Sequence, residues 1–139
     1  MKRTANAHWQ GDLKSGKGDI STASGVLSNT QYSFSTRFEN GVGTNPEELI
    51  AAAHAGCFAM AFSAELGKVG LTPESISATA TVSLEKTNEG FTVTESHLDV
   101  TAKVPGVDRA KVTEIANGAK AGCPISRLLK AKVTMDLKL

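Results

Sequence analysis

The sequence predicts an α+β fold in which one long central helix is covered by antiparallel strands. The first observation is that residues 44–70 form a continuous run of small and apolar residues with well-marked ends. The second is that apolar side chains alternate along residues 76–86 and 91–104, as they do in amphipathic strands. The third is that Gly- and Pro-containing turns separate these segments, so the strands are expected to pair as hairpins.

Before the long helix, residues 5–10 and 18–23 are predicted to be short strands, because turn-forming residues separate them. Residues 31–39, QYSFSTRFE, alternate aromatic residues and threonine with polar residues. This period of two predicts a third strand, with Arg37 on the opposite face from Phe34 and Phe38.

The start of the long helix is marked by its first residues. Asn45 suits the N-cap, Pro46 suits the first helical position, and Glu47 places a carboxylate in the positive first turn. Gly70 supplies a stop signal. The helix is therefore predicted to run from about residue 46 to the glycines near residue 70.

The interior of this helix has no polar face. Between Glu48 and Glu65 there is no formally charged residue, and His54 and Ser63 are the only clearly polar side chains. A helix of this kind is normally buried, and one small domain encloses it poorly, so a partner subunit is expected. The uncharged run is shorter than the roughly 18 residues of a membrane span, which favours the core helix of a soluble protein.

After the helix, the strands at 76–86 and 91–104 change parity near residues 94–97, which predicts a bulge or bend there. Residues 108–121 have helical spacing and Asp108 as a cap. A short helix is expected over CPISRLLK, and residues 131–139 are expected to form the closing strand.

Composition limits the possible functions. The 139 residues predict one domain with a net charge of +1, and no basic block points to nucleic acid. The N-terminus lacks an apolar signal segment, so a cytoplasmic protein is expected. The two cysteines and three histidines lack the paired spacing of metal ligands, so no metal is expected, and a phosphate-binding loop is absent.

The two cysteines are the remaining candidates for chemistry. Cys57 lies in the middle of the long helix, whereas Cys123 stands before Pro124, where a helix is predicted to begin. Amide hydrogens at a helix N-terminus stabilise a thiolate, so local physics favours Cys123 as the nucleophile. The alternative for either cysteine is a small buried side chain.

The segments NPEELIAAAHAGCF and AGCPIS resemble the OsmC/Ohr family of thiol peroxidases, and AHWQGDLKSGKG with FSTRFENGVGTNPEELI resembles its OsmC branch. The resemblance spans nearly the whole chain. It implies a single OsmC-like domain over residues 1–139, in an intertwined homodimer whose two central helices are wrapped by antiparallel sheets. It also implies reduction of organic hydroperoxides, and more weakly of hydrogen peroxide, without a cofactor.

The resemblance implies that Cys57 is the peroxide-attacking cysteine and Cys123 the resolving cysteine. This assignment is opposite to the one that the helix start next to Cys123 favours. It implies a sulfenic acid on Cys57, then a Cys57–Cys123 disulfide that an external dithiol reduces, either a lipoylated protein or a thioredoxin-like one. The non-enzymatic alternative is a stress protein that binds a lipid or another small molecule, for which the cysteines are incidental.

The family also supplies an arginine and a glutamate that activate the attacking thiol. The glutamate of the Asn-Pro-Glu motif falls on Glu47, and Arg37 is the preferred arginine, with Arg3 and Arg127 left open. His54, one turn before Cys57, is a further candidate for lowering the pKa of that thiol or for donating a hydrogen bond.

The spacing of Glu47 and Cys57 predicts a composite site. Ten residues on one helix correspond to about 15 Å along its axis, so the two side chains cannot touch within one chain. In an antiparallel pair of helices, Glu47 of one subunit could reach Cys57 of the other. Two composite sites per homodimer are therefore expected.

Overall fold

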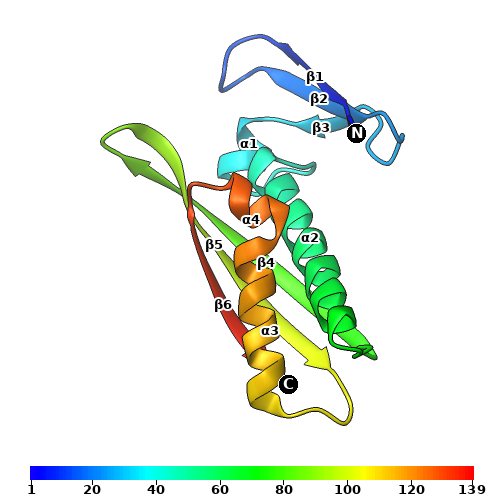
Figure 1. The fold of residues 1–139 in the computed structure, drawn as a ribbon. Coiled ribbons are helices and arrows are strands. Elements are labelled where there is room, and N and C mark those ends of the chain that lie inside the picture. The colour runs from blue at the N-terminus through cyan, green and yellow to red at the C-terminus, as the bar shows by residue number, and fades with distance from the viewer. The chain divides into compact units, whose positions relative to one another are not determined.

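A computed structural model describes all 139 residues and contains helices together with two three-stranded sheets (Figure 1). The helices are α1 (Phe34–Phe38), α2 (Pro46–Lys68), α3 (Arg109–Gly122) and α4 (Pro124–Leu128). The strands are β1 (Ala5–Gln10), β2 (Lys17–Thr22), β3 (Thr30–Tyr32), β4 (Ser75–Thr87), β5 (Gly90–Lys103) and β6 (Lys132–Lys138). The chain divides into two compact units, an N-terminal unit of residues 1–49 and a C-terminal unit of residues 50–139.

The N-terminal unit is built on the antiparallel sheet β1-β2-β3. Gly18 lies between Trp9 and Tyr32, whose rings meet with centroids 5.5 Å apart. A Cβ atom on Gly18 would come within 2.7 Å of the Trp9 ring and 2.6 Å of the Tyr32 ring. Glycine at this position therefore allows the two aromatic rings to pack together.

The prediction of a strand over residues 31–39 is wrong beyond Tyr32, because residues 34–38 form helix α1. Ser33 and Thr36 make a capping box: the Ser33 side chain accepts from the Thr36 amide at 3.3 Å, and Thr36 Oγ1 accepts from the Ser33 amide at 2.8 Å. Phe34 and Phe38 are four residues apart, a spacing that suits one face of either a helix or a strand. The capping pair favours the helix.

Helix α2 begins where the sequence predicts. Asn45 Oδ1 accepts a hydrogen bond from the Glu48 amide at 2.8 Å, which confirms the N-cap. Burial is limited to one stripe at intervals of four residues, comprising His54, Phe58, Phe62 and Leu66. Small residues on its other sides are exposed, in line with the expectation that one small domain encloses this helix poorly.

By length and apolar composition alone, α2 could also cross a membrane, with 22% of its most apolar window buried in the chain. Core helices of soluble proteins meet the same criteria, so this property is weak evidence of a membrane span.

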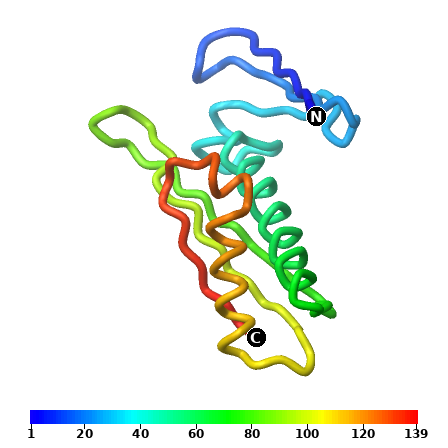
Figure 2. Tube along the Cα trace, in the orientation of Figure 1, coloured from blue at the N-terminus to red at the C-terminus, as the bar shows by residue number.

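The C-terminal unit is built on the sheet β4-β5-β6. Strands β4 and β5 form an antiparallel hairpin in which Ser83 pairs with Glu95 and Leu84 with Val93, leaving Thr94 as an extra residue. This confirms the bulge predicted from the change of parity. Strand β6 returns after two helices and pairs with β5 in parallel (Figure 2), as such long crossover connections permit.

One face of this sheet packs against α2 and α3 and forms the core. The buried apolar residues are Phe58, Phe62 and Leu66 of α2, Leu98, Val100 and Ala102 of β5, and Val112, Ala116 and Ala119 of α3. Asp108 caps α3 as predicted, accepting from the Ala110 amide. Cys123 ends α3 and directly begins α4, with Pro124 in the first turn, so this cysteine is fixed at the junction of two helices.

Candidate functional site: two thiols and an arginine–glutamate pair

The C-terminal unit brings the two cysteines together. Cys57, in the middle of α2, and Cys123, between α3 and α4, are 66 residues apart in sequence, and their sulfur atoms lie 2.8 Å apart. Both are free thiols. Because each sulfur is held by a helix that packs on the same sheet, the pair is preorganised for exchange between thiol and disulfide forms.

The two sulfurs differ in exposure. Cys123 is completely buried, whereas Cys57 is partly exposed. Burial raises the pKa of the Cys57 thiol, the neighbouring Cys123 raises it further, and a hydrogen bond from the Ile125 amide lowers it in part. None of these causes is a positive charge. Cys57 therefore needs a cation to be a thiolate at neutral pH.

The hydrogen bond from the Ile125 amide is relevant to the prediction, made from the local sequence, that Cys123 is the nucleophile. The sequence correctly predicts a helix start next to Cys123. However, the Ile125 amide in the first turn of α4 donates to Cys57. The start of this helix thus stabilises the sulfur of Cys57, which another helix brings to it.

In the N-terminal unit, Arg37 and Glu47 form a bidentate ion pair. Arg37 Nε lies 3.1 and 3.2 Å from the two carboxylate oxygens, and Nη2 lies 2.7 Å from Oε1. The Glu47 side chain is 12% exposed and that of Arg37 is 38% exposed. The Arg37 guanidinium also lies over the Phe38 ring, 5.4 Å from its centroid. These contacts fix the orientation of the guanidinium.

The two alternative candidates for the activating arginine, Arg3 and Arg127, have different surroundings. Arg3 lies near the N-terminus and donates to the Lys2 carbonyl, and Arg127 is exposed in the last turn of α4. Neither forms an ion pair with Glu47, whereas Arg37 does.

A pocket of about 290 Å³ opens beside Arg37 in the N-terminal unit. Its wall is mostly aromatic and includes two ring pairs, Trp9 with Tyr32 and Phe34 with Phe38. Leu13, Ser33 and Pro46 complete the lining. The pocket combines apolar surface with one oriented cation, which suits an apolar molecule that carries a polar oxygen group.

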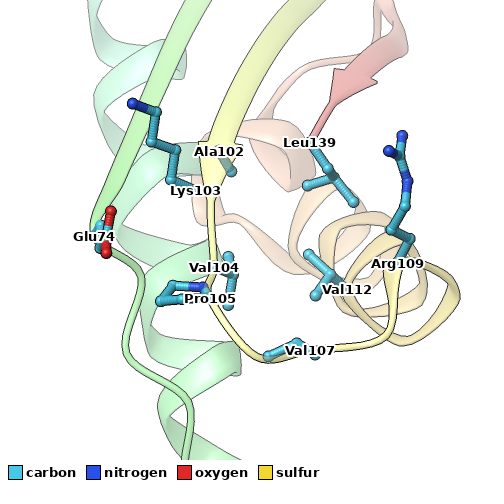
Figure 3. A pocket seen from close by; sticks show the side chains of 9 residues that line it. All are labelled: Glu74, Ala102, Lys103, Val104, Pro105, Val107, Arg109, Val112 and Leu139. Atoms are coloured by element: carbon cyan, nitrogen blue, oxygen red, sulfur yellow. The ribbon is translucent and has the colours of Figure 1, made fainter.

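A second pocket, of about 260 Å³, lies in the C-terminal unit where β5 leads into α3 (Figure 3). Val104, Pro105 and Val107 come from that connection, and Arg109 begins α3. Cys123 follows the other end of this 14-residue helix, about 20 Å away at the α-helical rise. None of the candidate residues lines this pocket.

His54 is completely buried and uses both ring nitrogens. Nδ1 lies 2.7 Å from Ser96 Oγ on β5, and Nε2 lies 2.8 Å from Ser126 Oγ on α4. Burial lowers the pKa of the imidazole, so the ring is neutral at pH 7. The idea that His54 donates to Cys57 is therefore wrong, because both nitrogens are committed to serines. The two serines carry no motif by which the sequence could have indicated them.

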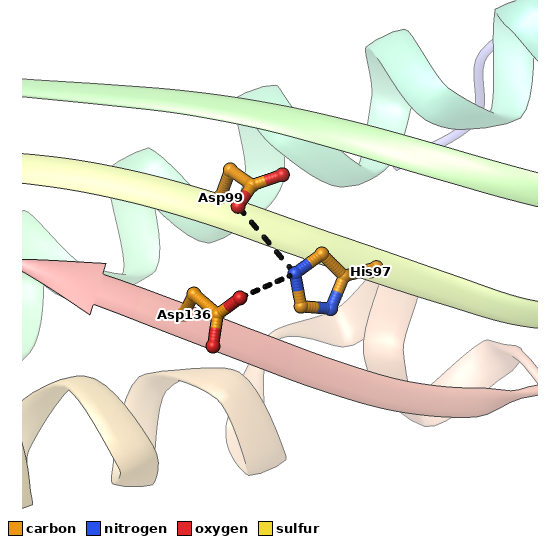
Figure 4. A group of neighbouring side chains, drawn as sticks. All are labelled: His97, Asp99 and Asp136. Carbon is orange, nitrogen blue, oxygen red and sulfur yellow. Dashed lines mark ion pairs between the residues drawn. The ribbon is translucent and has the colours of Figure 1, made fainter.

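His97 forms a different cluster on the sheet. Its Nε2 lies 3.2 Å from Asp136 on β6 and 3.5 Å from Asp99 on β5 (Figure 4). Its Nδ1 contacts Thr134 Oγ1 at 2.6 Å. The three potential metal-ligating atoms lie within 4.8 Å of one another. However, the carboxylates of Asp99 and Asp136 are 60% and 83% exposed, and exposed acidic groups of this kind are common without a metal ion. The cluster links β5 and β6 through side-chain contacts.

The geometry can be compared with known proteins. A family model described as OsmC-like protein matches residues 38–138. The chain is 53% identical over 139 residues to Peroxiredoxin OsmC of Escherichia coli (strain K12), covering 100% of this chain and 97% of that one. It is 28% identical over 123 residues to the organic hydroperoxide resistance protein OhrB of Bacillus subtilis, covering 88% of each.

Solved structures agree with these sequence matches. The crystal structure of Bacillus subtilis OhrB superposes with a TM-score of 0.73 over 98% of this chain and 97% of that one. An OsmC-like protein of unknown function from Vibrio cholerae, at 18% identity, superposes with a TM-score of 0.78 over 99% of each chain and supports the fold alone. The family model and the full-length identity together show that the chain belongs to the OsmC-like protein family.

Proposed function

We propose that this chain is a two-cysteine thiol peroxidase that reduces organic hydroperoxides, and more weakly hydrogen peroxide, to alcohols or water. The observation that carries the proposal is the pair of free thiols with sulfurs 2.8 Å apart, one partly exposed and one buried. Two relatives, which are named as a peroxiredoxin and an organic hydroperoxide resistance protein, support the same chemistry.

The reaction follows from the difference in exposure. The Cys57 thiolate attacks the outer peroxide oxygen, the O–O bond breaks, and the leaving alkoxide takes up a proton to give an alcohol. Cys57 is left as a sulfenic acid. Cys123 then attacks the Cys57 sulfur and water leaves as the disulfide forms. An external dithiol, from a lipoylated or a thioredoxin-like protein, returns both thiols.

Arg37 supplies the positive charge that the surroundings of Cys57 lack. Its guanidinium stabilises the thiolate and the developing charge on the peroxide oxygens, and Glu47 holds the guanidinium in place through two parallel hydrogen bonds. The pair thereby counteracts the rise that burial causes in the Cys57 pKa.

The working unit is a homodimer with two composite sites. The side of α2 that faces away from the core stripe exposes small residues together with Met60, which is 77% exposed, and a second copy of the helix would cover them. In this arrangement Arg37 and Glu47 of one subunit serve Cys57 of the other. Residues 1–139 then act as one domain, in a soluble cytoplasmic protein.

The aromatic pocket beside Arg37 would bind the organic part of the substrate. We expect cumyl alcohol, the product from cumene hydroperoxide, to change the fluorescence of Trp9, the only tryptophan of the chain, in a saturable way. Leu13→Ala should weaken this binding about fivefold, because it removes roughly 1 kcal/mol of apolar contact. The titration is done with Cys57→Ser, so that no chemistry interferes.

Val26→Ala is the control for this titration, because Val26 is an exposed apolar residue of the same unit that does not line the pocket. A fluorescence signal that does not saturate, or an equal loss of affinity in both variants, would argue against the pocket as the binding site.

The proposed function is tested by mass spectrometry after one equivalent of cumene hydroperoxide. We expect the loss of two protons, about 2 Da, and a disulfide joining the peptides that carry Cys57 and Cys123. Thiols that stay unchanged would contradict the peroxidase. If the thiols stay unchanged and a variant with both Cys57 and Cys123 replaced by serine keeps full affinity for cumyl alcohol, the alternative of a binding protein without redox turnover is favoured.

A further inference from the structure

We propose that His54 is a positioning residue: through Ser126 it holds helix α4 in place, and it thereby keeps Cys123 within reach of Cys57 while the state of the sulfurs changes. The inference rests on the proposed function, because the position of Cys123 matters to turnover only if this cysteine forms the disulfide.

The imidazole links three elements of the C-terminal unit. It projects from α2, its Nδ1 contacts Ser96 Oγ at 2.7 Å, and its Nε2 contacts Ser126 Oγ at 2.8 Å. Ser96 lies on β5, the middle strand of the sheet, and is itself completely buried. The ring therefore ties α4 both to the long helix and to the central strand.

Helix α4 depends on such a tie because it is a single short turn of five residues. Two residues of α2, spaced one helical turn apart, hold its N-terminal end. Cys57 accepts from the Ile125 amide and contacts the Cys123 sulfur, while His54 contacts Ser126. Cys123 ends α3 and directly precedes this turn, so the placement of α4 contributes to the position of its sulfur.

Only one of these two attachments survives the reaction unchanged. Oxidation of Cys57 alters the sulfur that accepts from Ile125, so that attachment varies with redox state. The contact between His54 and Ser126 contains no sulfur. A neutral imidazole donates from one nitrogen and accepts at the other, and a serine hydroxyl can match either role, so the ring stays bonded to both serines.

The step that benefits is formation of the disulfide. The Cys123 sulfur attacks the sulfur of the Cys57 sulfenic acid, the S–O bond breaks, and hydroxide leaves with the Cys123 proton as water. A tether that holds the attacking sulfur near its target raises the effective concentration of that sulfur without touching it.

The test uses two serine variants of the full-length chain that each remove one hydrogen bond from the same imidazole. Each variant is equilibrated with mixtures of reduced and oxidised dithiothreitol, and the Cys57–Cys123 disulfide is quantified by alkylation and mass. We expect Ser126→Ala to lower the equilibrium constant for disulfide formation about tenfold, which raises the reduction potential by about 30 mV. Ser96→Ala is the matched control and should change the constant by about twofold or less.

A second pair of variants replaces the ring itself and covers the case in which a serine variant fails to fold. The Asn amide nitrogen occupies nearly the place of Nδ1, and the Gln amide nitrogen nearly that of Nε2. His54→Asn should therefore keep the contact to Ser96 and behave as Ser126→Ala does. His54→Gln should keep the contact to Ser126 and stay close to the wild type, and Ser126→Thr, which retains the hydroxyl, should restore the wild-type potential.

The outcomes distinguish the positioning role of His54, through its contact with Ser126, from the proposed peroxidase function. Equal shifts of the reduction potential in Ser126→Ala and Ser96→Ala, or in the two His54 variants, would contradict the positioning role but not the peroxidase function. A wild-type chain that forms no disulfide at any dithiothreitol ratio would overturn both. A Cys57 sulfenic acid that lives about tenfold longer in Ser126→Ala, with an unchanged rate of peroxide attack, would support the tether.

Discussion

Replacing Cys57 with serine should lower the rate of hydroperoxide reduction about 1,000-fold or more, the scale on which the loss of a catalytic nucleophile acts. A hydroxyl at this position stays protonated and cannot take an oxygen atom from the peroxide to form a sulfenic acid. Consumption of cumene hydroperoxide, followed with excess dithiol, measures this loss.

Replacing Cys123 should give a different result. The first step needs only Cys57, so Cys123→Ser should still consume one equivalent of peroxide and then stall. The trapped sulfenic acid would add about 16 Da and react with a sulfenic-acid probe. Since Cys123 is completely buried and Cys57 is partly exposed, the opposite pattern, with Cys57→Ser keeping the single equivalent, would reverse the roles proposed for the two thiols.

Local signals in the sequence explain why most of the fold could be predicted. The N-cap at Asn45, the cap at Asp108 and the bulge at Thr94 each depend on residues close in the chain, and each appears in the structure where expected. Helix α1 was missed for the same reason. Alternation in residues 31–39 and the capping pair of Ser33 with Thr36 are competing local signals, and the capping pair prevailed.

The surroundings of the thiols could not be predicted in the same way, because they depend on contacts distant in sequence. Ser96 and Ser126 lie 42 and 72 residues from His54. Likewise, the helix start next to Cys123 suggested that this cysteine would be stabilised, yet the Ile125 amide reaches across to Cys57. Local sequence propensity identifies where a helix begins or ends. It does not identify which side chain of another helix lies against that end.

Replacing Arg37 with lysine should lower the second-order rate constant for peroxide attack on Cys57 about 100-fold. Lysine keeps the charge but not the planar fork that pairs with Glu47 through two parallel hydrogen bonds. Burial already raises the pKa of the Cys57 thiol, and loss of the oriented cation should raise it further. The rate of peroxide attack in the variant should therefore increase only at higher pH, where the thiolate forms. Stopped-flow kinetics across the pH range measures both effects.

Glu47→Gln should have a smaller effect on this rate constant, about tenfold, because the guanidinium remains but is held less firmly. Arg3→Lys and Arg127→Lys are the controls and test the alternatives directly, since neither side chain pairs with Glu47. A loss in either control that equals the loss in Arg37→Lys would move the activating role away from Arg37.

Mixing two inactive variants distinguishes a site within one subunit from a composite one. In a dimer of one Cys57→Ser chain and one Arg37→Ala chain, a composite site joins the intact Arg37 of the first chain to the intact Cys57 of the second. Random reassortment makes half of the dimers mixed, each with one working site of two, so about one quarter of the wild-type activity should return. If both residues serve the site of their own subunit, every site in the mixture lacks one of them, and the mixture should stay as inactive as its components.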